Sequence, residues 1–209
     1  YGSMAVQSSR GCPFNCEFCD IIEMFGRVPR YKLPEQFIRE MDLLYETGYR
    51  GSLFIVDDNF IGNKKKVREL LDHIIEWQKS RNYPFSLYTE ASINLAEDDG
   101  LLDRMVAAGL DMVFIGIETP VQETLEHTNK MQNTKSDIIE SISKIQEKGI
   151  EVMGGFIVGF DTDPENIFDL QIEFIQKAGI PLAMIGTLIA LPGTQLYRRL
   201  EAEGRIIGE

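Results

Sequence analysis

The sequence predicts an α/β fold built on a parallel sheet, and two features of its 209 residues support this. Six short apolar runs of strand length alternate with longer segments in which apolar residues recur at helical spacing. Several of the runs are apolar throughout, as strands covered on both faces are. A chain of this length can form one domain, because roughly 70% of the unfolded surface is buried at this size.

The first expected strand leads into a cysteine-rich loop, and the last is the longest apolar stretch. We interpret that stretch as a buried strand, because it contains Gly186 and Thr187 and is shorter than the ~18 apolar residues of a membrane span. No membrane span is therefore expected. The expected strands cover residues 4–9, 52–56, 85–91, 112–117, 151–158 and 182–191.

An amphipathic helix is expected after each strand. The first begins at Pro34 and places Phe37, Ile38 and Met41 on one face, and the second follows the basic run 64–66, which we interpret as a solvated first turn. Later helices show the same spacing around residues 101–106, 138–145, 167–175 and 196–200. Left-handed closing glycines are expected at Gly48, Gly109, Gly149, Gly179 and Gly204.

Six strand–helix pairs fit either an open doubly wound sheet or an incomplete TIM-type barrel, and the pattern alone does not choose between them. In both architectures ligands bind at the carboxyl ends of the strands. The polar residues that follow each strand are therefore the first candidates for a site.

The charge balance excludes one class of function. A formal net charge of −12 argues against a broad basic surface for nucleic acid, because counterion release requires clustered lysine and arginine. Free thiols and the lack of a secretory signal favour a reducing, cytoplasmic setting.

Cys12, Cys16 and Cys19 are the only cysteines in the chain, and they lie on one short loop. Three thiolates on a compact loop can hold three corners of a cubane iron–sulfur cluster and leave the fourth iron open. A structural zinc ion would need a fourth ligand, for which only His73 and His127 are available. A disulfide would leave one thiol over, and buried cysteines are usually scattered among apolar residues.

The C-x3-C-x2-C loop, with Phe18 directly before the third cysteine, resembles the signature of the radical S-adenosylmethionine (radical SAM) superfamily. The resemblance implies a partial (β/α)6 TIM-type barrel with parallel strands. It also implies that the three cysteines bind a four-iron four-sulfur (4Fe-4S) cluster and that S-adenosylmethionine (SAM) chelates the fourth iron. One electron then cleaves SAM to methionine and a 5′-deoxyadenosyl radical, which abstracts a substrate hydrogen. Phe18 matches the family's backbone contact to adenine.

Polar groups after the second strand match a region that meets the methionine amino group in the family. Asp57, Asp58 and Asn59 stand where the family often has Gly-Gly-Glu, so the match is approximate, and a polar turn is the alternative. On the third strand, the resemblance implies contacts from Glu90 and Ser92 to the ribose hydroxyls. A structural ion pair between Glu90 and an arginine is the alternative.

The fourth strand carries Gly116 and Glu118, a partial match to the family's G-x-I-x-G-x-x-E region. The resemblance implies packing beside the adenosyl group, and a structural role for Glu118 is the alternative. On the fifth strand, Ile157 or Val158 matches an apolar residue that packs on adenine. The paired glycines before them lack the G-x-G-x-x-G spacing, which excludes a dinucleotide-binding loop.

The segment after the sixth strand resembles one whose backbone contacts adenine. It contains Leu191, Pro192 and Gly193, and a Pro-Gly turn capped by Thr194 is a compatible alternative.

Two further segments were assigned by their residues alone. Residues 126–130 are expected to form a solvated loop. Arg27 and Arg30 follow the cysteine loop and are expected to pair either with a ligand carboxylate or with Glu40.

Residues 9–16 and 57–60 most resemble a subgroup of the family whose full-length members carry an N-terminal cobalamin-binding domain and often methylate unactivated carbon. Cobalamin is then possible only through a domain that this chain does not contain. A small-molecule substrate and a single-electron reductant such as a flavodoxin or ferredoxin are implied, with no nucleic acid. The alternatives are a methylthiotransferase and a non-catalytic iron–sulfur domain for electron transfer or structure.

The ends of the sequence suggest domain boundaries. Residues 1–3 resemble a cloning remnant, and residues 4–209 are expected to be a radical SAM catalytic core taken from a longer protein.

Overall fold

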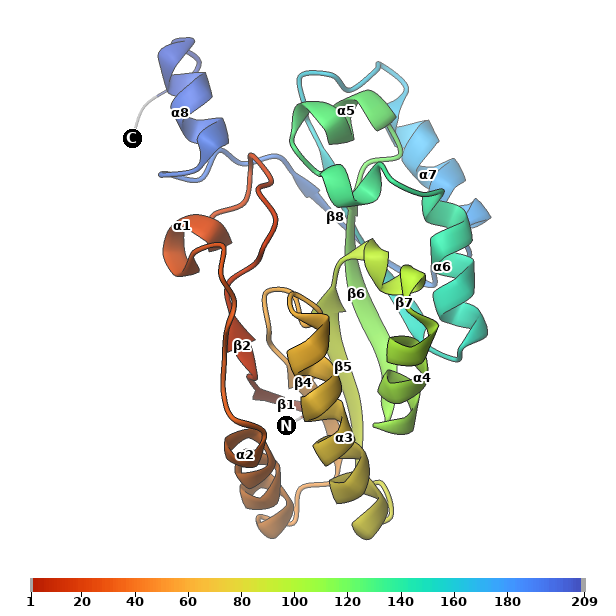
Figure 1. Ribbon diagram of the computed structural model, residues 1–209. Helices are drawn as coiled ribbons and strands as arrows, with labels where there is room; N and C mark the ends of the chain where they lie inside the picture. Colours follow the sequence, from red (N-terminus) through yellow and green to blue (C-terminus); the bar gives the residue numbers. More distant parts are fainter. Residues whose placement is uncertain (1, 208–209) are drawn as a thin grey trace.

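The computed structural model describes residues 2–207 and places one six-stranded parallel sheet at its centre (Figure 1). Residues 1, 208 and 209, which the expected domain boundaries include, lie outside the described residues. The boundary expected between residues 3 and 4 falls within the first strand. The sheet contains β1 (Ser3–Val6), β4 (Gly51–Ile55), β5 (Phe85–Ala91), β6 (Leu110–Glu118), β7 (Glu151–Val158) and β8 (Leu182–Thr187). A separate antiparallel ribbon pairs β2 (Ser9–Arg10) with β3 (Arg30–Tyr31).

The order of the strands selects one of the two architectures left open by the sequence. The order is β1-β4-β5-β6-β7-β8, so each new strand of the sheet is added at the same edge. A doubly wound sheet instead reverses its strand order at a switch point. The fold is therefore a partial (β/α)6 barrel, and the predicted parallel α/β class is confirmed.

The six expected helices are present, and a helix follows each strand of the sheet. Consecutive helices α2, α3 and α4 contact one another along the sheet. Asn63 and Asp98 cap α3 and α4 by accepting from the backbone amides of Lys66 and Leu101. The corresponding elements are α2 (Pro34–Glu46), α3 (Lys64–Ser80), α4 (Asp99–Ala107), α6 (Ile138–Glu147), α7 (Ile167–Lys177) and α8 (Gln195–Ala202).

Four short helices were not expected, because each is too brief to show a helical period in the sequence. They are α1 (Ile21–Phe25), the 3-10 helix η1 (Ile93–Glu97), α5 (Gln122–His127) and the 3-10 helix η2 (Met131–Asn133). All four lie in connections that follow the cysteine loop or a strand.

Burial along the strands shows which face meets the helices. On β5 the residues alternate strictly between buried and half-buried positions, with Leu87 and Thr89 fully buried and Glu90 on the opposite face. The buried face packs under α3 and α4 in one continuous core that includes Leu71, Leu101 and Met105. The half-buried face of the sheet is the concave side, so Glu90 points into the barrel interior.

The first expected strand is wrong at its carboxyl end, because the sheet strand stops at Val6 instead of continuing to Ser9. The Asp57 carboxylate accepts from the Ser8 amide at 2.7 Å and the Ser9 amide at 3.0 Å. These backbone donors are therefore unavailable to a sheet partner, and the chain leaves the sheet to form the β2–β3 ribbon.

The last expected strand is also shorter than predicted, and the expected burial is wrong. β8 pairs with β7 alone within residues 2–207, and Met184 and Ile185 are 58% and 55% exposed. Apolar composition predicts a strand here but does not reveal that the strand lies at an open edge. No helix among the described residues combines the length and apolar character needed to cross a membrane.

Replacing Asp57 tests whether this carboxylate holds the start of the cysteine loop. Asp57 is 1% exposed and also accepts from the Ser8 and Ser9 hydroxyls, so Asp57→Ala leaves four donors without their acceptor. We expect the free energy of unfolding, measured by urea denaturation, to fall by roughly 2–4 kcal/mol. Asp57→Asn keeps one acceptor oxygen and should cost less.

The matched control is Asp72→Ala, which removes a surface ion pair with Arg104 and should change stability by less than about 0.5 kcal/mol. Equal stability of the Asp57→Ala and Asp72→Ala variants would contradict the anchoring role.

Candidate functional site

The cysteine loop and the carboxyl ends of β4, β5 and β6 enclose a cavity, which we call the cysteine cavity. All three cysteines line it, together with acidic, amide and aromatic side chains from the strand ends. The lining residues are Cys12, Phe14, Cys16, Phe18, Cys19, Ile21, Asp58, Asn59, Glu90, Ala91, Ser92, Phe114, Gly116, Glu118, Lys130 and Gln132.

The three thiols are free and face two amide donors. Cys16 is buried, and Cys12 and Cys19 are half-buried. The side-chain amide of Asn59 donates to Cys12 Sγ at 3.8 Å, and that of Gln132 donates to Cys16 Sγ at 3.6 Å. Amide donors to sulfur stabilise thiolates that bind iron. The disulfide alternative is thus not what the structure contains.

Burial raises the pKa of the Cys12 thiol and raises that of Cys19 to about 11. Without a bound cation these thiols would stay protonated, whereas a coordinating metal deprotonates its thiol ligands. Within residues 2–207, no three His, Cys, Asp or Glu side chains lie close enough together to bind one metal ion. A cubane places its ligands on separate irons, and three thiols on one loop can supply three of its four corners.

A buried ion pair forms one wall of the cavity. Lys130 Nζ lies 2.6 Å from Glu118 Oε1, and the two side chains are 12% and 10% exposed. Burial alone would lower the pKa of Lys130, but the carboxylate of Glu118 and the nearby Cys16 thiol raise it above its usual value. The ammonium group therefore remains charged beside the cysteines, where it can offset the negative charge of thiolates or of a ligand carboxylate.

The interpretation of residues 126–130 as a solvated loop is wrong, because Glu126 and His127 end α5, Thr128 is buried and Lys130 lines the cysteine cavity. His127 is exposed, but the chain turns inward through Asn129, which has a φ of +57°. Lys130 and the following Gln132 then reach the cavity from the loop between α5 and α6. The sequence around Lys130 and Gln132 shows neither periodicity nor a motif. The one signal for the turn is Asn129, because asparagine adopts a positive φ more readily than most residues.

Gly116 leaves the space that this ion pair fills. A Cβ atom at Gly116 would overlap Glu118 Oε1 and would lie 3.0 Å from Lys130 Nζ. Glu118 itself has a φ of +67°, and the register between β6 and β7 shifts between Gly116 and Glu118. The bulge thus turns the Glu118 carboxylate toward Lys130. Gly155 on β7 makes similar room for the ring of Phe114.

Two further carboxylates lie at the ends of β4 and β5. Asp58 accepts from the Gly11 amide at 2.7 Å and so supports the cysteine loop from inside the cavity. Within the part of the chain that the structure describes, Glu90 forms no ion pair, so the predicted alternative of an arginine partner is not found. Burial and the charge of Asp58 raise the pKa of Glu90. Ser92 is held by Asn59, whose Nδ2 lies 3.2 Å from Ser92 Oγ.

The remaining predicted residues do not line the cysteine cavity. Asp57 is turned toward Ser8 and Ser9. Val158 is buried, and the Ile157 carbonyl accepts from Gln171. Leu191, Pro192 and Gly193 form the turn that was given as the alternative, in which Thr194 caps α8 and its amide donates to the Leu191 carbonyl at 3.1 Å.

The turn before α8 nevertheless lies against the cysteine loop. The Leu196 amide donates to the Glu17 carbonyl at 3.0 Å, and Gln195 Nε2 donates to Asn15 at 3.0 Å. Arg199 also pairs with the buried Glu17 at 2.6 Å. The C-terminal helix therefore fixes the outer side of the loop that carries the cysteines, a role that the sequence analysis did not assign to it.

Comparison with known proteins agrees with this geometry. The chain matches the model of the radical SAM superfamily over residues 6–193. The chain belongs to the radical SAM superfamily. Binding of an iron–sulfur cluster and of SAM is typical of this family, and the family predicted from the cysteine loop is confirmed.

Two of the similar relatives are named as a methyltransferase or a methylase. The chain is 50% identical over 209 residues to an uncharacterized methyltransferase of Synechocystis sp. The alignment covers 100% of this chain and 39% of the relative. It is 44% identical to the hopanoid C-2 methylase of Rhodopseudomonas palustris, over 97% of this chain and 38% of the relative. The chain thus spans about two fifths of the length of these relatives.

Solved structures share the fold. The radical SAM methyltransferase TsrM of Kitasatospora setae superposes with a TM-score of 0.84 at 16% identity, over 97% of this chain and 39% of that chain. This similarity supports the partial barrel.

Replacing Gly116 tests the space for the buried ion pair. Gly116→Ala forces the Glu118 carboxylate away from Lys130, and we expect the free energy of unfolding to fall by roughly 1–3 kcal/mol. Urea denaturation measures the change. Gly186→Ala on β8 is the matched control, because a Cβ there meets nothing within 4 Å. A Gly116→Ala variant as stable as the control would contradict this account.

Replacing the cysteines distinguishes the cubane from zinc. Anaerobic reconstitution should give about four irons per chain, and alanine at Cys12, Cys16 or Cys19 should abolish the visible absorption of the cluster. The double variant His73→Ala/His127→Ala should keep its iron. Stoichiometric zinc that depends on either histidine would support the zinc alternative instead.

Proposed function

We propose that this chain is the catalytic core of a radical SAM methyltransferase. The observation that carries the proposal is the cysteine cavity: three free thiols, an open interior and an uncompensated carboxylate, in a chain that belongs to this superfamily. Cys12, Cys16 and Cys19 would hold three irons of a 4Fe-4S cluster. A cluster held there would supply the electron for the reductive cleavage of SAM.

The strand ends would position SAM. Asp58 and Asn59 lie beside Cys12 and offer acceptors to an amino group, as the approximate family match implies. Glu90 and Ser92 lie at the end of β5 and offer acceptors to the ribose hydroxyls. Because Glu90 has no cationic partner within residues 2–207, its carboxylate is available to a ligand.

The walls of the cavity would hold the rest of SAM and exclude water. Phe18 and the backbone at Gly116 face the interior, and the Glu118–Lys130 pair closes one side. We keep the proposal that Ile157, Val158 and the turn formed by Leu191, Pro192 and Gly193 border the adenine. The contact between the Phe18 and Phe160 rings, 5.9 Å apart, supports it by bringing the end of β7 to the cysteine loop. Asp57 is best assigned to support of the loop.

The named relatives favour methyl transfer to carbon of a small molecule. They include a hopanoid C-2 methylase and a bacteriochlorophyllide methyltransferase of Chlorobaculum tepidum. Cobalamin would act through a part of the protein outside this chain, in keeping with the structures of TsrM and OxsB, which bind cobalamin. We propose a cytoplasmic setting and, as reductant, a flavodoxin or ferredoxin. The core domain proposed for residues 4–209 would then also include Ser3, which begins β1.

The alternative of a methylthiotransferase has weaker support, because a putative methylthiotransferase of Methanocaldococcus jannaschii is only 24% identical to the chain. A non-catalytic iron–sulfur domain would normally close its cluster with four protein ligands, whereas this loop supplies three.

Replacing Glu90 tests the SAM site and predicts opposite effects on binding and stability. The reconstituted wild type, reduced by dithionite, should cleave SAM to 5′-deoxyadenosine, which mass spectrometry detects. Glu90→Gln should weaken SAM binding by roughly 1–3 kcal/mol while the iron content stays unchanged.

Because burial raises the pKa of Glu90, its charge destabilises the folded state above that pKa and the cost disappears as pH falls through it. Glu90→Gln should therefore raise the melting temperature of the cluster-free protein near pH 8 and change it little near pH 4.

The matched control is Glu151→Gln, at the exposed amino end of β7. It should change neither SAM binding nor melting temperature. Loss of stability in the Glu90→Gln variant would indicate that Glu90 has a structural role. A full cluster that yields no 5′-deoxyadenosine would contradict the proposed function.

A further inference from the structure

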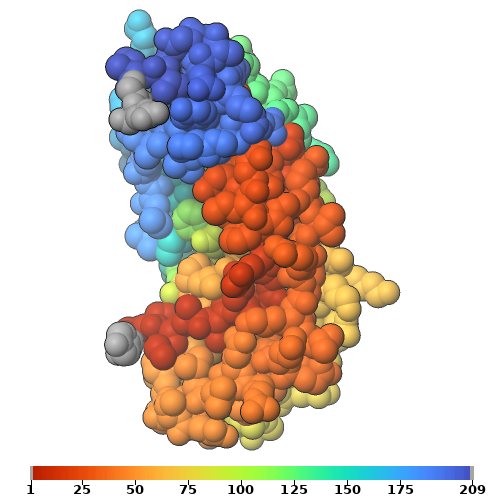
Figure 2. All heavy atoms as spheres, turned by 90° about the vertical axis from the view of Figure 1, so that its left-hand side faces the viewer, coloured from red at the N-terminus to blue at the C-terminus, as the bar shows by residue number. Residues whose placement is uncertain are grey.

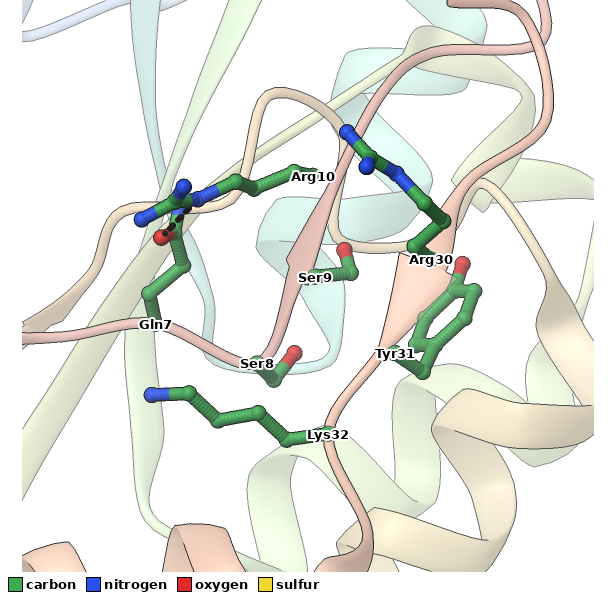
Figure 3. Close-up of a pocket in the computed structure, with 7 residues that line it drawn as sticks. All are labelled: Gln7, Ser8, Ser9, Arg10, Arg30, Tyr31 and Lys32. Atoms are coloured by element: carbon green, nitrogen blue, oxygen red, sulfur yellow. Dashed lines mark hydrogen bonds between the residues drawn. The ribbon is translucent and has the colours of Figure 1, made fainter. Parts of the chain in front are cut away.

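A second hollow lies against the residues that lead into the cysteine loop. It has a volume of ≈250 Å³ and lies along the β2–β3 ribbon (Figure 3). The two hollows share no lining residue. We call this hollow the basic groove, because three of its residues are cationic and none is acidic. Its lining residues are Gln7, Ser8, Ser9, Arg10, Arg30, Tyr31 and Lys32.

The two arginines of the basic groove carry charge that the fold does not neutralise. Arg10 donates to the neutral Gln7 side chain at 2.8 Å, and Arg30 donates to the Phe25 carbonyl at 3.5 Å. Neither guanidinium forms an ion pair with any residue in the described range 2–207. The expected partner Glu40 pairs with Lys32 instead, so the predicted salt bridge from Arg27 or Arg30 to Glu40 is wrong.

The buried acid beneath the groove is already fully occupied. Asp57 accepts from both amides and both hydroxyls of Ser8 and Ser9, and it is 1% exposed. Its charge partly offsets the arginines at close range, but its oxygens cannot also accept from them. In a chain with a net charge of −12, the exposed guanidiniums of Arg10 and Arg30 therefore form a local site for an anionic partner.

The basic groove is close to the first cysteine along the chain. Arg10 lines the groove, and Cys12, two residues later, lines the cysteine cavity. In the segment between Ser8 and Cys12, Asp57 accepts from the Ser8 amide and Asp58 accepts from the Gly11 amide. The Cys12 amide donates to the Gly26 carbonyl, and a Cβ at Gly11 would lie 2.9 Å from that same oxygen. The packing between the two segments is therefore tight.

A third arginine, outside the groove, extends the positive surface around this packed segment. Arg27 donates to the Pro13 carbonyl at 3.2 Å and forms no ion pair within residues 2–207. The neighbouring Val28 is 79% exposed. Figure 2 shows that the cysteine loop and the residues that follow it stand at the surface on this face of the molecule. A protein partner could thus contact the basic groove, Arg27 and an apolar residue together.

We propose that the basic groove is the docking site for an acidic single-electron carrier protein of the flavodoxin or ferredoxin class. The inference rests on the proposed function and specifies where its reductant binds. The donor loses one electron and the cluster held by the three cysteines gains it, and no atom or proton is transferred. Docking on this side leaves the cysteine cavity free for substrate, because the two hollows have no residue in common. Attraction to the arginines opposes the repulsion between two acidic proteins at this groove.

The test compares two electron donors on the reconstituted protein. Reduced flavodoxin is an acidic protein donor, whereas reduced methyl viologen is a small cation that the basic groove does not attract. Bleaching of the cluster, followed by stopped-flow absorbance, gives the reduction rate for each donor. The test variant is Arg10→Gln/Arg30→Gln. Its matched control is Lys65→Gln/Lys79→Gln, which removes the same charge from two exposed positions on α3.

We expect Arg10→Gln/Arg30→Gln to slow reduction by flavodoxin about tenfold or more, and the control variant to change it by less than about twofold. Reduction by methyl viologen should be alike in all three proteins. The wild-type rate with flavodoxin should fall as ionic strength rises, and this measurement needs no variant.

An equal flavodoxin rate in both variants, or a wild-type rate that does not depend on salt, would overturn the docking site. Saturation of the groove by inorganic phosphate with no effect on the flavodoxin rate would also overturn it and would indicate a small-anion site. Failure of methyl viologen to reduce a full cluster, or to support SAM cleavage, would instead contradict the proposed function.

Discussion

Two adjacent aspartates at the end of β4 hold the cysteine loop in place, and the rest of the site depends on this attachment. Asp57 binds Ser8 and Ser9 from beneath, and Asp58 binds the Gly11 amide from inside the cavity. Burial raises the pKa of Asp57, while the hydrogen bonds from Ser8 and Ser9 oppose that rise. The cost of burying this carboxylate is offset by saturating both of its oxygens. A loop attached in this way presents its thiols to the strand ends with little freedom.

The second constraint is the buried charge opposite the cysteines. Lys130 remains protonated because Glu118 pairs with it, and Glu118 can reach it because β6 bulges and Gly116 has no side chain. A methyl group added at Gly116 would displace the Glu118 carboxylate, and Lys130 would then lose its partner. The charge in the cavity therefore depends on the lack of a side chain at Gly116. In the proposed site, reduction of the cluster would add negative charge, and the ammonium of Lys130 would lower the energy of that reduced state. The fold would then contribute electrostatics as well as ligands.

The sequence predicted the parts of the molecule that follow local rules. The bounds of β5 and β7 agree with the apolar runs, and the long helices follow their 3.6-residue period. Glu90 could be singled out as a cavity residue, because a carboxylate on an apolar strand is costly unless it is paired, hydrogen-bonded or placed at the open end of the strand. Lys130 and Gln132 could not, since a one-turn 3-10 helix and an inward loop leave no periodic signal. The early end of β1 escaped prediction for a different reason: its cause, Asp57, is some fifty residues away in the chain.

The open edge of the sheet has a consequence for how the molecule behaves in solution. Among residues 2–207, the outer side of β8 has no strand partner, and exposed side chains such as Met184 and Ile185 flank it. Such an edge is a template for strand addition, whether by another segment of a longer protein or by a second copy. Natural edge strands usually carry lysine, proline or a bulge to prevent this, and β8 has none of these features. The overall charge of −12 then becomes the main barrier to association between copies, and that barrier weakens as salt screens it.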